Sequence, residues 1–188
     1  MMEKVFGKLF WGFLLIMFDF RLQGIDLLPD VIGYILMAGG LKLVLEESAS
    51  FAAARKLVLP LGILSLGNLY EPPAEPGVFM NLGPFGAFGI FLGIVYILLN
   101  IKMVFHLFQG IIEVAKKQAN TDLAQEAHER WKQYLALQIA VLSAMLLFML
   151  PGLGMLIFIL VWIASIVVMI GILNTMKRCG RELHILRE

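Results

Sequence analysis

The densest group of polar side chains in this sequence lies between residues 19 and 30. It contains three aspartates, Asp19, Asp26 and Asp30, together with Arg21. Carboxylates gathered beside one guanidinium group could bind a cation or a basic group of a solute, with Arg21 orienting them. A structural alternative is that Asp26 or Asp30 caps the helix that follows, while Arg21 pairs with a neighbouring acid.

Further polar residues stand at the start of a segment, residues 70–84, that is rich in proline and glycine. Asn68, Tyr70 and Glu71 would lie at the same face of a membrane as the aspartates and could complete a binding site. Asn and Tyr at a membrane interface also serve as simple anchors. The candidate ligand-binding residues are therefore Asp19, Arg21, Asp26, Asp30, Asn68, Tyr70 and Glu71.

The sequence lacks the patterns of a catalytic or metal centre. Gly-x-Ser-x-Gly, His-Glu-x-x-His and a phosphate-binding glycine loop do not occur. The single cysteine, Cys179, can form neither an intrachain disulfide nor a thiolate zinc cluster, and His128 and His184 have no ligands at metal-binding spacing. We therefore expect no metal and no cofactor, and we predict that the protein is not an enzyme.

The amino-acid composition indicates a membrane protein. Of its 188 residues 60% are hydrophobic and 15% charged, whereas soluble domains are less apolar and richer in charge. One soluble core could not bury that much apolar surface. The net charge of +1 is spread along the chain, which argues against a nucleic-acid partner.

Six apolar segments are predicted to form transmembrane helices in a single integral membrane domain. They cover residues 5–20, 30–45, 51–69, 85–108, 131–150 and 155–173, and several are close to the minimum length. In this arrangement fourteen of the fifteen Lys and Arg residues fall on one side, and only Arg21 on the other. Positive charge favours the cytosol. We therefore predict an all-α, polytopic membrane helix bundle with both termini in the cytosol.

Residues 122–130 are predicted to be a cytosolic helical extension of the fifth span. Asp122 and Gln125 fit a capping box at its start. Glu126 and Arg130 have the i,i+4 spacing of a helix-stabilising ion pair. This segment would let the fifth helix begin below the membrane surface.

Aromatic and polar side chains within the spans carry further expectations. Trp131 and Tyr134 are expected to mark the membrane interface. A polar seam could be formed by Asn100, His106 and Gln109, although anchoring at the interface explains these residues as well. Trp162, near the middle of the sixth span, is expected to be buried between helices.

Small residues recur along two of the spans. Gly89 and Gly93 form a Gly-x-x-x-Gly pair in the fourth span, and Ala136, Ala140 and Ala144 repeat every four residues in the fifth. Helices in lipid associate where small residues let their backbones approach. These stripes predict helix packing within the chain, with a homodimer interface as the alternative.

The N-terminal third shares a run of residues with a known group of proteins. The run consists of Phe18-Asp19-Phe20-Arg21, Gly24, Asp26, Leu28-Pro29-Asp30 and Ile32-Gly33-Tyr34. It resembles uncharacterised small multi-pass membrane proteins of Gram-positive bacteria, which implies a bacterial plasma membrane but assigns no activity. In architecture the chain is also similar to the substrate-binding subunits of energy-coupling-factor vitamin transporters. Their Ala-x-x-x-Ala motif is, however, missing from the first span.

We expect a protein that binds or translocates a small solute or ion, alone or as a subunit of a transporter. Asp19, Arg21, Asp26 and Asp30 would form its outer recognition site. The alternative is a membrane anchor or regulatory interaction protein that uses the helical extension at residues 122–130. The expected partners are the lipid bilayer and other membrane-protein subunits.

Overall fold

The computed structural model describes residues 2–17, 21–22, 25–26, 30–68, 86–147 and 153–184. The fold class is all-α, as predicted. The described elements are α1 (Met2–Met17), β1 (Arg21–Leu22), β2 (Ile25–Asp26), α2 (Asp30–Leu41), η1 (Lys42–Val44), α3 (Ala49–Ser65), η2 (Leu66–Asn68), α4 (Gly86–Lys117), α5 (Thr121–Leu147) and α6 (Leu153–Glu182). The two short strands pair antiparallel, and η1 and η2 are single 3₁₀ turns that extend α2 and α3.

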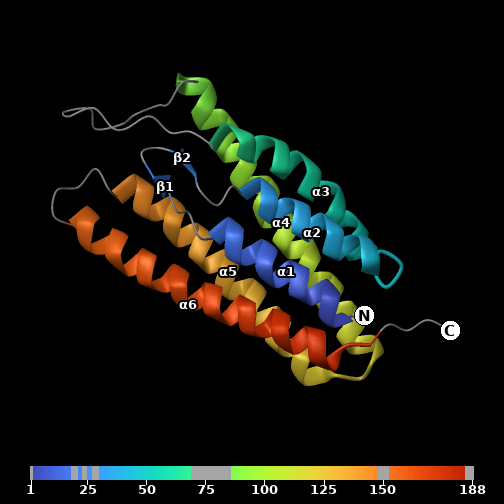
Figure 1. Cartoon of the computed structure of the whole chain (residues 1–188). Coiled ribbons are helices and arrows are strands. Elements are labelled where there is room, and N and C mark those ends of the chain that lie inside the picture. Colours follow the sequence, from blue (N-terminus) through green and yellow to red (C-terminus); the bar gives the residue numbers. More distant parts are fainter. Residues whose placement is uncertain are drawn as a thin grey trace.

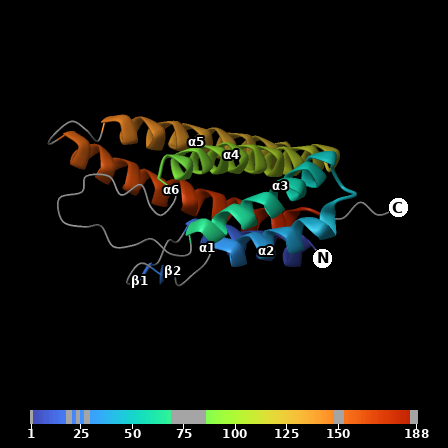
Figure 2. The same cartoon turned by 90° about the horizontal axis from the view of Figure 1, so that it is seen from above.

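The six α-helices form a closed ring in chain order. Each helix packs against the helices before and after it, and α6 packs back onto α1. Figure 2 shows α4 and α5 on one side of this ring, α1 and α2 on the opposite side, and α3 and α6 between them. The connections after α2, α4 and α5 are short, and short connections favour such antiparallel neighbours. The ring therefore has an interior that side chains from opposite helices must fill.

Glycines bring α1 and α2 into close contact. A Cβ atom at Gly33 would lie 2.8 Å from the carbonyl oxygen of Gly12, and one at Gly12 would lie 2.9 Å from that of Gly33. Only glycine permits this approach of two backbones. The prediction that the small-residue stripes of the fourth and fifth spans pack within the chain is wrong at two positions. A Cβ at Gly93 would meet nothing within 4 Å, and Ala136 is exposed.

The helix α5 begins one residue before the predicted capping box. Asn120 Oδ1 accepts a hydrogen bond from the backbone N–H of Leu123 at 3.1 Å, so Asn120 is the N-cap. The capping box at Asp122 is therefore wrong, because Asp122 already lies in the first turn. Residues 122–130 are helical, as expected, and continue without a break into the rest of α5.

The bundle has two halves that differ in what their surfaces carry. We call residues 2–10, 41–58, 102–133 and 171–184 the packed half. We call residues 11–17, 30–40, 59–66, 86–101, 134–147 and 153–170 the apolar-faced half. Of the described side chains, every exposed large apolar one lies in the apolar-faced half, and every Lys and Arg lies in the packed half. One plane across the bundle thus separates the surface with exposed apolar side chains from the surface with Lys and Arg.

Within the described residues, two helices are long and apolar enough to cross a membrane. They are α4, over Phe91–Lys117, and α6, over Leu156–Glu182. Trp162 is 58% exposed on α6, so the expectation that it is buried between helices is wrong. A water-soluble protein rarely exposes so much continuous apolar surface. These two helices give weak support to a membrane protein, and the arrangement of six spans remains a prediction.

Candidate functional site

A chain of hydrogen bonds crosses the interior of the ring in the apolar-faced half. The side-chain amide of Asn100 on α4 donates to the hydroxyl of Tyr34 on α2 at 2.9 Å. The hydroxyls of Tyr34 and Tyr96 are 2.8 Å apart. The Tyr96 hydroxyl in turn donates to Oδ2 of Asp30, at 3.4 Å. The chain therefore connects α4 to the first residue of α2.

The same chain continues from Asn100 into α5. The Tyr134 hydroxyl donates to Oδ1 of Asn100 at 2.5 Å, and the Gln138 amide donates to the Tyr134 hydroxyl at 2.9 Å. Because the single hydroxyl proton of Tyr96 goes to Asp30, Tyr34 must donate to Tyr96. Every donor then points toward the Asp30 carboxylate, and each bond polarises the next. We call this set the polar chain: Asp30, Tyr34, Tyr96, Asn100, Tyr134 and Gln138.

Burial explains why the polar chain is complete. Tyr34 is 1% exposed and Tyr134 is 4% exposed. A buried hydroxyl or amide without a partner costs free energy, so such groups are hydrogen-bonded in folded proteins. The rings of Tyr34 and Tyr96 also contact each other edge to face, with centroids 6.5 Å apart. These contacts fix the side chains in one arrangement.

A cavity of about 200 Å³ lies beside the polar chain, inside the ring of helices. Phe13, Ile16 and Met17 of α1 form one apolar wall. The opposite walls combine apolar side chains of α4 with four members of the polar chain: Tyr96, Asn100, Tyr134 and Gln138. None of the residues that line this cavity is charged. Such a site offers hydroxyl and amide groups to a small molecule within apolar walls.

The structure joins one of the predicted site residues to this interior site. Asp30 accepts the hydrogen bond from Tyr96 at the end of the polar chain. Arg21 and Asp26 occupy paired positions of the β1–β2 hairpin, with backbones described and side chains not. The side chain of Asn68 is likewise not described. The remaining candidates lie outside the described residues: Asp19, Tyr70 and Glu71.

Sequence reasoning missed most of the polar chain. The interpretation of Tyr134 as an interface marker is wrong, since the residue is buried and bonded to Asn100. His106 lies against Phe105 and lines neither the polar chain nor the cavity. One sequence signal was available. The polar chain consists of three i,i+4 pairs, each on one helix face: Asp30 with Tyr34, Tyr96 with Asn100, and Tyr134 with Gln138.

A second polar cluster fixes α5 against α6 in the packed half. The guanidinium of Arg178 contacts Glu126 at 2.6 Å and Glu182 at 2.7 Å. Thr175 also donates to Glu126, at 2.6 Å. The predicted pair of Glu126 with Arg130 is wrong, because Glu126 bonds instead to residues of α6.

The surroundings of Glu126 change its acidity. Burial acts to raise the pKa of this carboxyl group, but the hydrogen bonds from Thr175 and Arg178 and the charge of Arg178 outweigh burial. Together they hold the pKa of Glu126 below its usual value. The carboxylate therefore stays ionised at neutral pH and serves as a link between helices.

Within the described ranges, no three His, Cys, Asp or Glu side chains lie together as a metal site. Comparison with models of protein families, with curated proteins and with solved structures gives no match. The resemblance of the first 45 residues to small bacterial membrane proteins therefore remains an expectation.

Proposed function

We propose that the protein is a bacterial plasma-membrane protein with six transmembrane helices that binds a small, neutral polar solute, alone or as a subunit of a transporter. The solute would occupy the cavity beside the polar chain. The observation that carries this proposal is the cavity itself, in which four hydrogen-bonding side chains face apolar walls. The polar chain links helices, and the four of its side chains that line the cavity also offer hydrogen-bonding groups to a ligand there.

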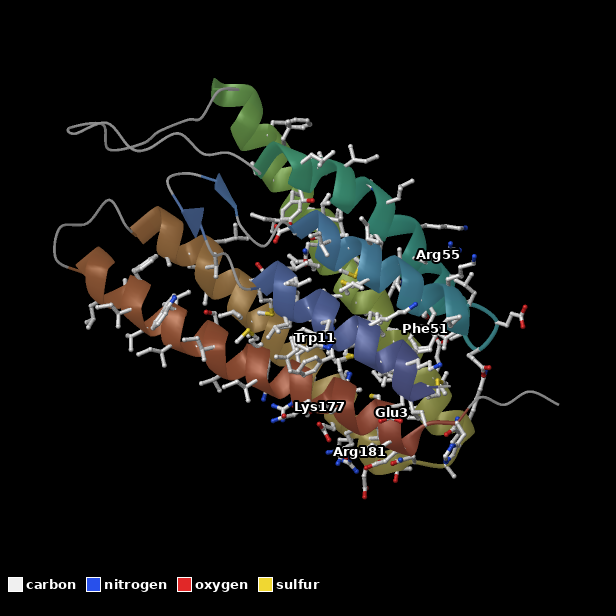
Figure 3. The ribbon with its side chains drawn as sticks, viewed as in Figure 1. Glu3, Trp11, Phe51, Arg55, Lys177 and Arg181 are labelled. Carbon is white, nitrogen blue, oxygen red and sulfur yellow. The ribbon has the colours of Figure 1, made fainter. Side chains whose placement is uncertain are left out.

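Placement in a membrane is supported by the two surfaces of the bundle. All six helices contribute exposed apolar side chains to the apolar-faced half, including Trp11 on α1, Ile35 on α2 and Leu59 on α3. The described cationic side chains are confined to the other half. Figure 3 shows Glu3, Lys177 and Arg181 together at that end of the bundle. Because positive charge favours the cytosol, we assign the packed half to the cytosolic side.

The lining of the cavity favours a neutral solute over an ion. An ion in an apolar site needs an opposite charge or a dense set of ligands, whereas the polar groups that line this cavity are all uncharged hydroxyls and amides. The volume of about 200 Å³ is below that of sites for drug-sized ligands. A solute of a few heavy atoms would fit. Asp30, where the polar chain ends, would then connect this site to the predicted outer acidic residues.

The alternative role as an anchor or regulatory partner receives less support. Leu123, Ala124 and Ala127 of the helical extension are buried in the bundle. Glu126 beside them is paired with Arg178 of α6. The apolar face of this helix is thus already used for packing within the chain.

Cysteine reactivity tests whether the cavity holds water and is open to solutes. Gln138 lines the cavity, whereas the adjacent Ile139 is 57% exposed on the lipid-facing side. A thiol reacts as its thiolate, which forms in a wet site and not in hydrocarbon. We expect Gln138→Cys to react with a small, membrane-impermeant methanethiosulfonate and the matched variant Ile139→Cys to stay unmodified. The native Cys179 is buried and should not contribute.

The same variant then identifies the solute. Polyols and small amides are added singly, and the bound compound should protect Gln138→Cys from modification. It should also raise the melting temperature of the wild type but not of Asn100→Leu, since a ligand at a hundred times its Kd adds about 2.7 kcal/mol. Equal reactivity at positions 138 and 139 would contradict the proposal.

A further inference from the structure

An apolar groove runs along the surface of the bundle between α2 and α3. Its volume is about 820 Å³. Ile35, Leu59 and Ile63 form its rims and are each more than half exposed, while Ala38 and Ala52 are small enough to leave the space between them open. We call this feature the α2–α3 groove.

One end of the groove carries two cations. Arg55 and Lys56 line it on the first turns of α3, close to the turn that joins α2 to α3. Arg55 is half-buried and Lys56 is exposed. Among the residues that the structure describes, neither side chain forms an ion pair or a hydrogen bond. Figure 3 shows Arg55 projecting from α3 away from the centre of the ring.

The other end of the groove is apolar throughout. On α3 the lining residues Leu59, Ile63 and Leu66 follow Arg55 at helical spacing, so they lie on one face. On α2 the lining extends to Val31. The groove therefore has a cationic end in the packed half and an apolar length in the apolar-faced half.

We propose that the α2–α3 groove binds an anionic phospholipid, with one acyl chain along the groove and its phosphate held by Arg55 and Lys56. An amphiphile with an anionic head and a long apolar tail matches both the charge and the shape of the site. The cationic end lies on the assigned cytosolic side, where anionic lipids attract Lys and Arg near the surface. The inference rests on the membrane placement proposed above and is independent of the solute cavity.

The bound acyl chain would also contact the polar chain. Tyr34 lines the groove, and its hydroxyl bonds to Tyr96 and Asn100 in the interior. Gly62 of α3 lies next to Tyr34, because a Cβ at this glycine would be 3.5 Å from that of Tyr34. A lipid in the groove would therefore pack against a side chain that holds the solute cavity in shape.

Lipid binding to the purified, delipidated protein tests the proposal. The protein in nonionic detergent is titrated with dioleoyl phosphatidylglycerol or dioleoyl phosphatidylcholine, which share acyl chains, and bound lipid is counted by native mass spectrometry. We expect phosphatidylglycerol to bind roughly 25-fold more tightly, about fivefold for each cation. The double variant Arg55→Gln with Lys56→Gln should lose this preference.

Three controls separate the groove from general attraction to positive charge. The double variant Lys132→Gln with Arg181→Gln removes one Lys and one Arg that are exposed outside the groove, and it should keep the full preference. Glycerol 1-phosphate, which lacks a tail, should not compete, and Ala38→Phe should weaken both lipids by filling the groove. Equal loss in the two double variants, or a preference that survives Arg55→Gln with Lys56→Gln, would overturn the proposal. The charge variants decide the matter even if Ala38→Phe does not fold.

Discussion

The packed half and the apolar-faced half are parts of the same six helices (Figure 1). They distribute polar and apolar groups in opposite ways. In the packed half, Phe51, Leu107 and Phe108 are fully buried, and the surface carries the charges. In the apolar-faced half, Leu98 and Ile163 are at least half exposed, while the polar chain lies inside. The membrane placement proposed above would put the packed half in water and the apolar-faced half in lipid.

This difference implies different sources of stability along one helix. In water, removing apolar surface drives packing, so the packed half gains free energy from its core. In lipid, helices gain almost no free energy from removing apolar surface from the solvent, because lipid tails are themselves apolar. Close contacts and interhelical hydrogen bonds stabilise their packing instead. The polar chain and the Gly12–Gly33 contact are what the apolar-faced half has in place of a large buried core. Substitutions on one helix, one in each half, can test this comparison.

The largest effect should come from a charge in the middle of the lipid-facing surface. Ile163 is 50% exposed on α6, and Lys at this position should cost about 3 kcal/mol of insertion free energy. Ile163→Lys is measured in a translocon insertion assay of α6. The control Asn174→Lys introduces the same charge on the same helix at an exposed position of the packed half, and it should cost nothing. If both variants insert equally well, water rather than lipid covers Ile163.

The next largest effect should separate two glycines of α4. A Cβ at Gly110 would collide with the buried ring of Phe51, approaching its Cε1 atom to 2.5 Å, whereas one at Gly93 meets nothing within 4 Å. Gly110→Ala should therefore lower the free energy of unfolding by about 2 kcal/mol. Gly93→Ala should leave it unchanged or raise it by up to about 1 kcal/mol. Thermal unfolding in mild detergent measures both, and equal destabilisation would mean that the two halves are packed alike.

The smallest effect concerns the carboxylate that links α5 to α6. Because the folded pKa of Glu126 is depressed, its contribution is present above the usual carboxyl pKa of about 4.3 and is lost as the pH falls through the folded pKa. Glu126→Gln should be about 1 kcal/mol less stable than the wild type at pH 7. The difference should shrink below about pH 4.

The control for this change is Glu129→Gln on the same helix. Among the described residues Glu129 pairs only with Lys132, and both side chains are more than half exposed. Such surface pairs contribute little, so this variant should match the wild type at every pH. A pH-independent difference for Glu126→Gln would show that its contact with Thr175 matters more than its charge.

Much of the fold followed from the sequence because it depends on local patterns. The long apolar segments at residues 85–108 and 155–173 predicted α4 and α6, and the helical extension at residues 122–130 is part of α5. Both long helices also run further than predicted, to Lys117 and Glu182. The hydropathy of a sequence predicts only where an apolar segment ends. The helix itself can continue beyond that point, until its terminal backbone groups find other hydrogen-bond partners.

The candidate site could not be predicted to the same degree. Polar residues close in sequence, such as Asp19, Arg21 and Asp26, were the visible candidates. The polar chain instead joins residues such as Tyr34 and Asn100 that are far apart in sequence. Tyr134 was expected at the interface because Tyr is common there, and nothing in its neighbours showed that α5 turns it inward.

The sequence by itself determined the helical class, the apolar character and the separation of charge, because each depends only on residue types and their order. The tertiary structure alone decided which faces of six similar helices meet. That choice put Tyr96, Tyr134, Asn100 and Gln138 around one cavity and left Arg55 and Lys56 at the end of a groove. The physical reason is that an apolar side chain is acceptable against either lipid or protein, so hydropathy cannot tell the two neighbours apart. Close contacts at glycines and the need to pair every buried polar group decide which helix faces contact other helices.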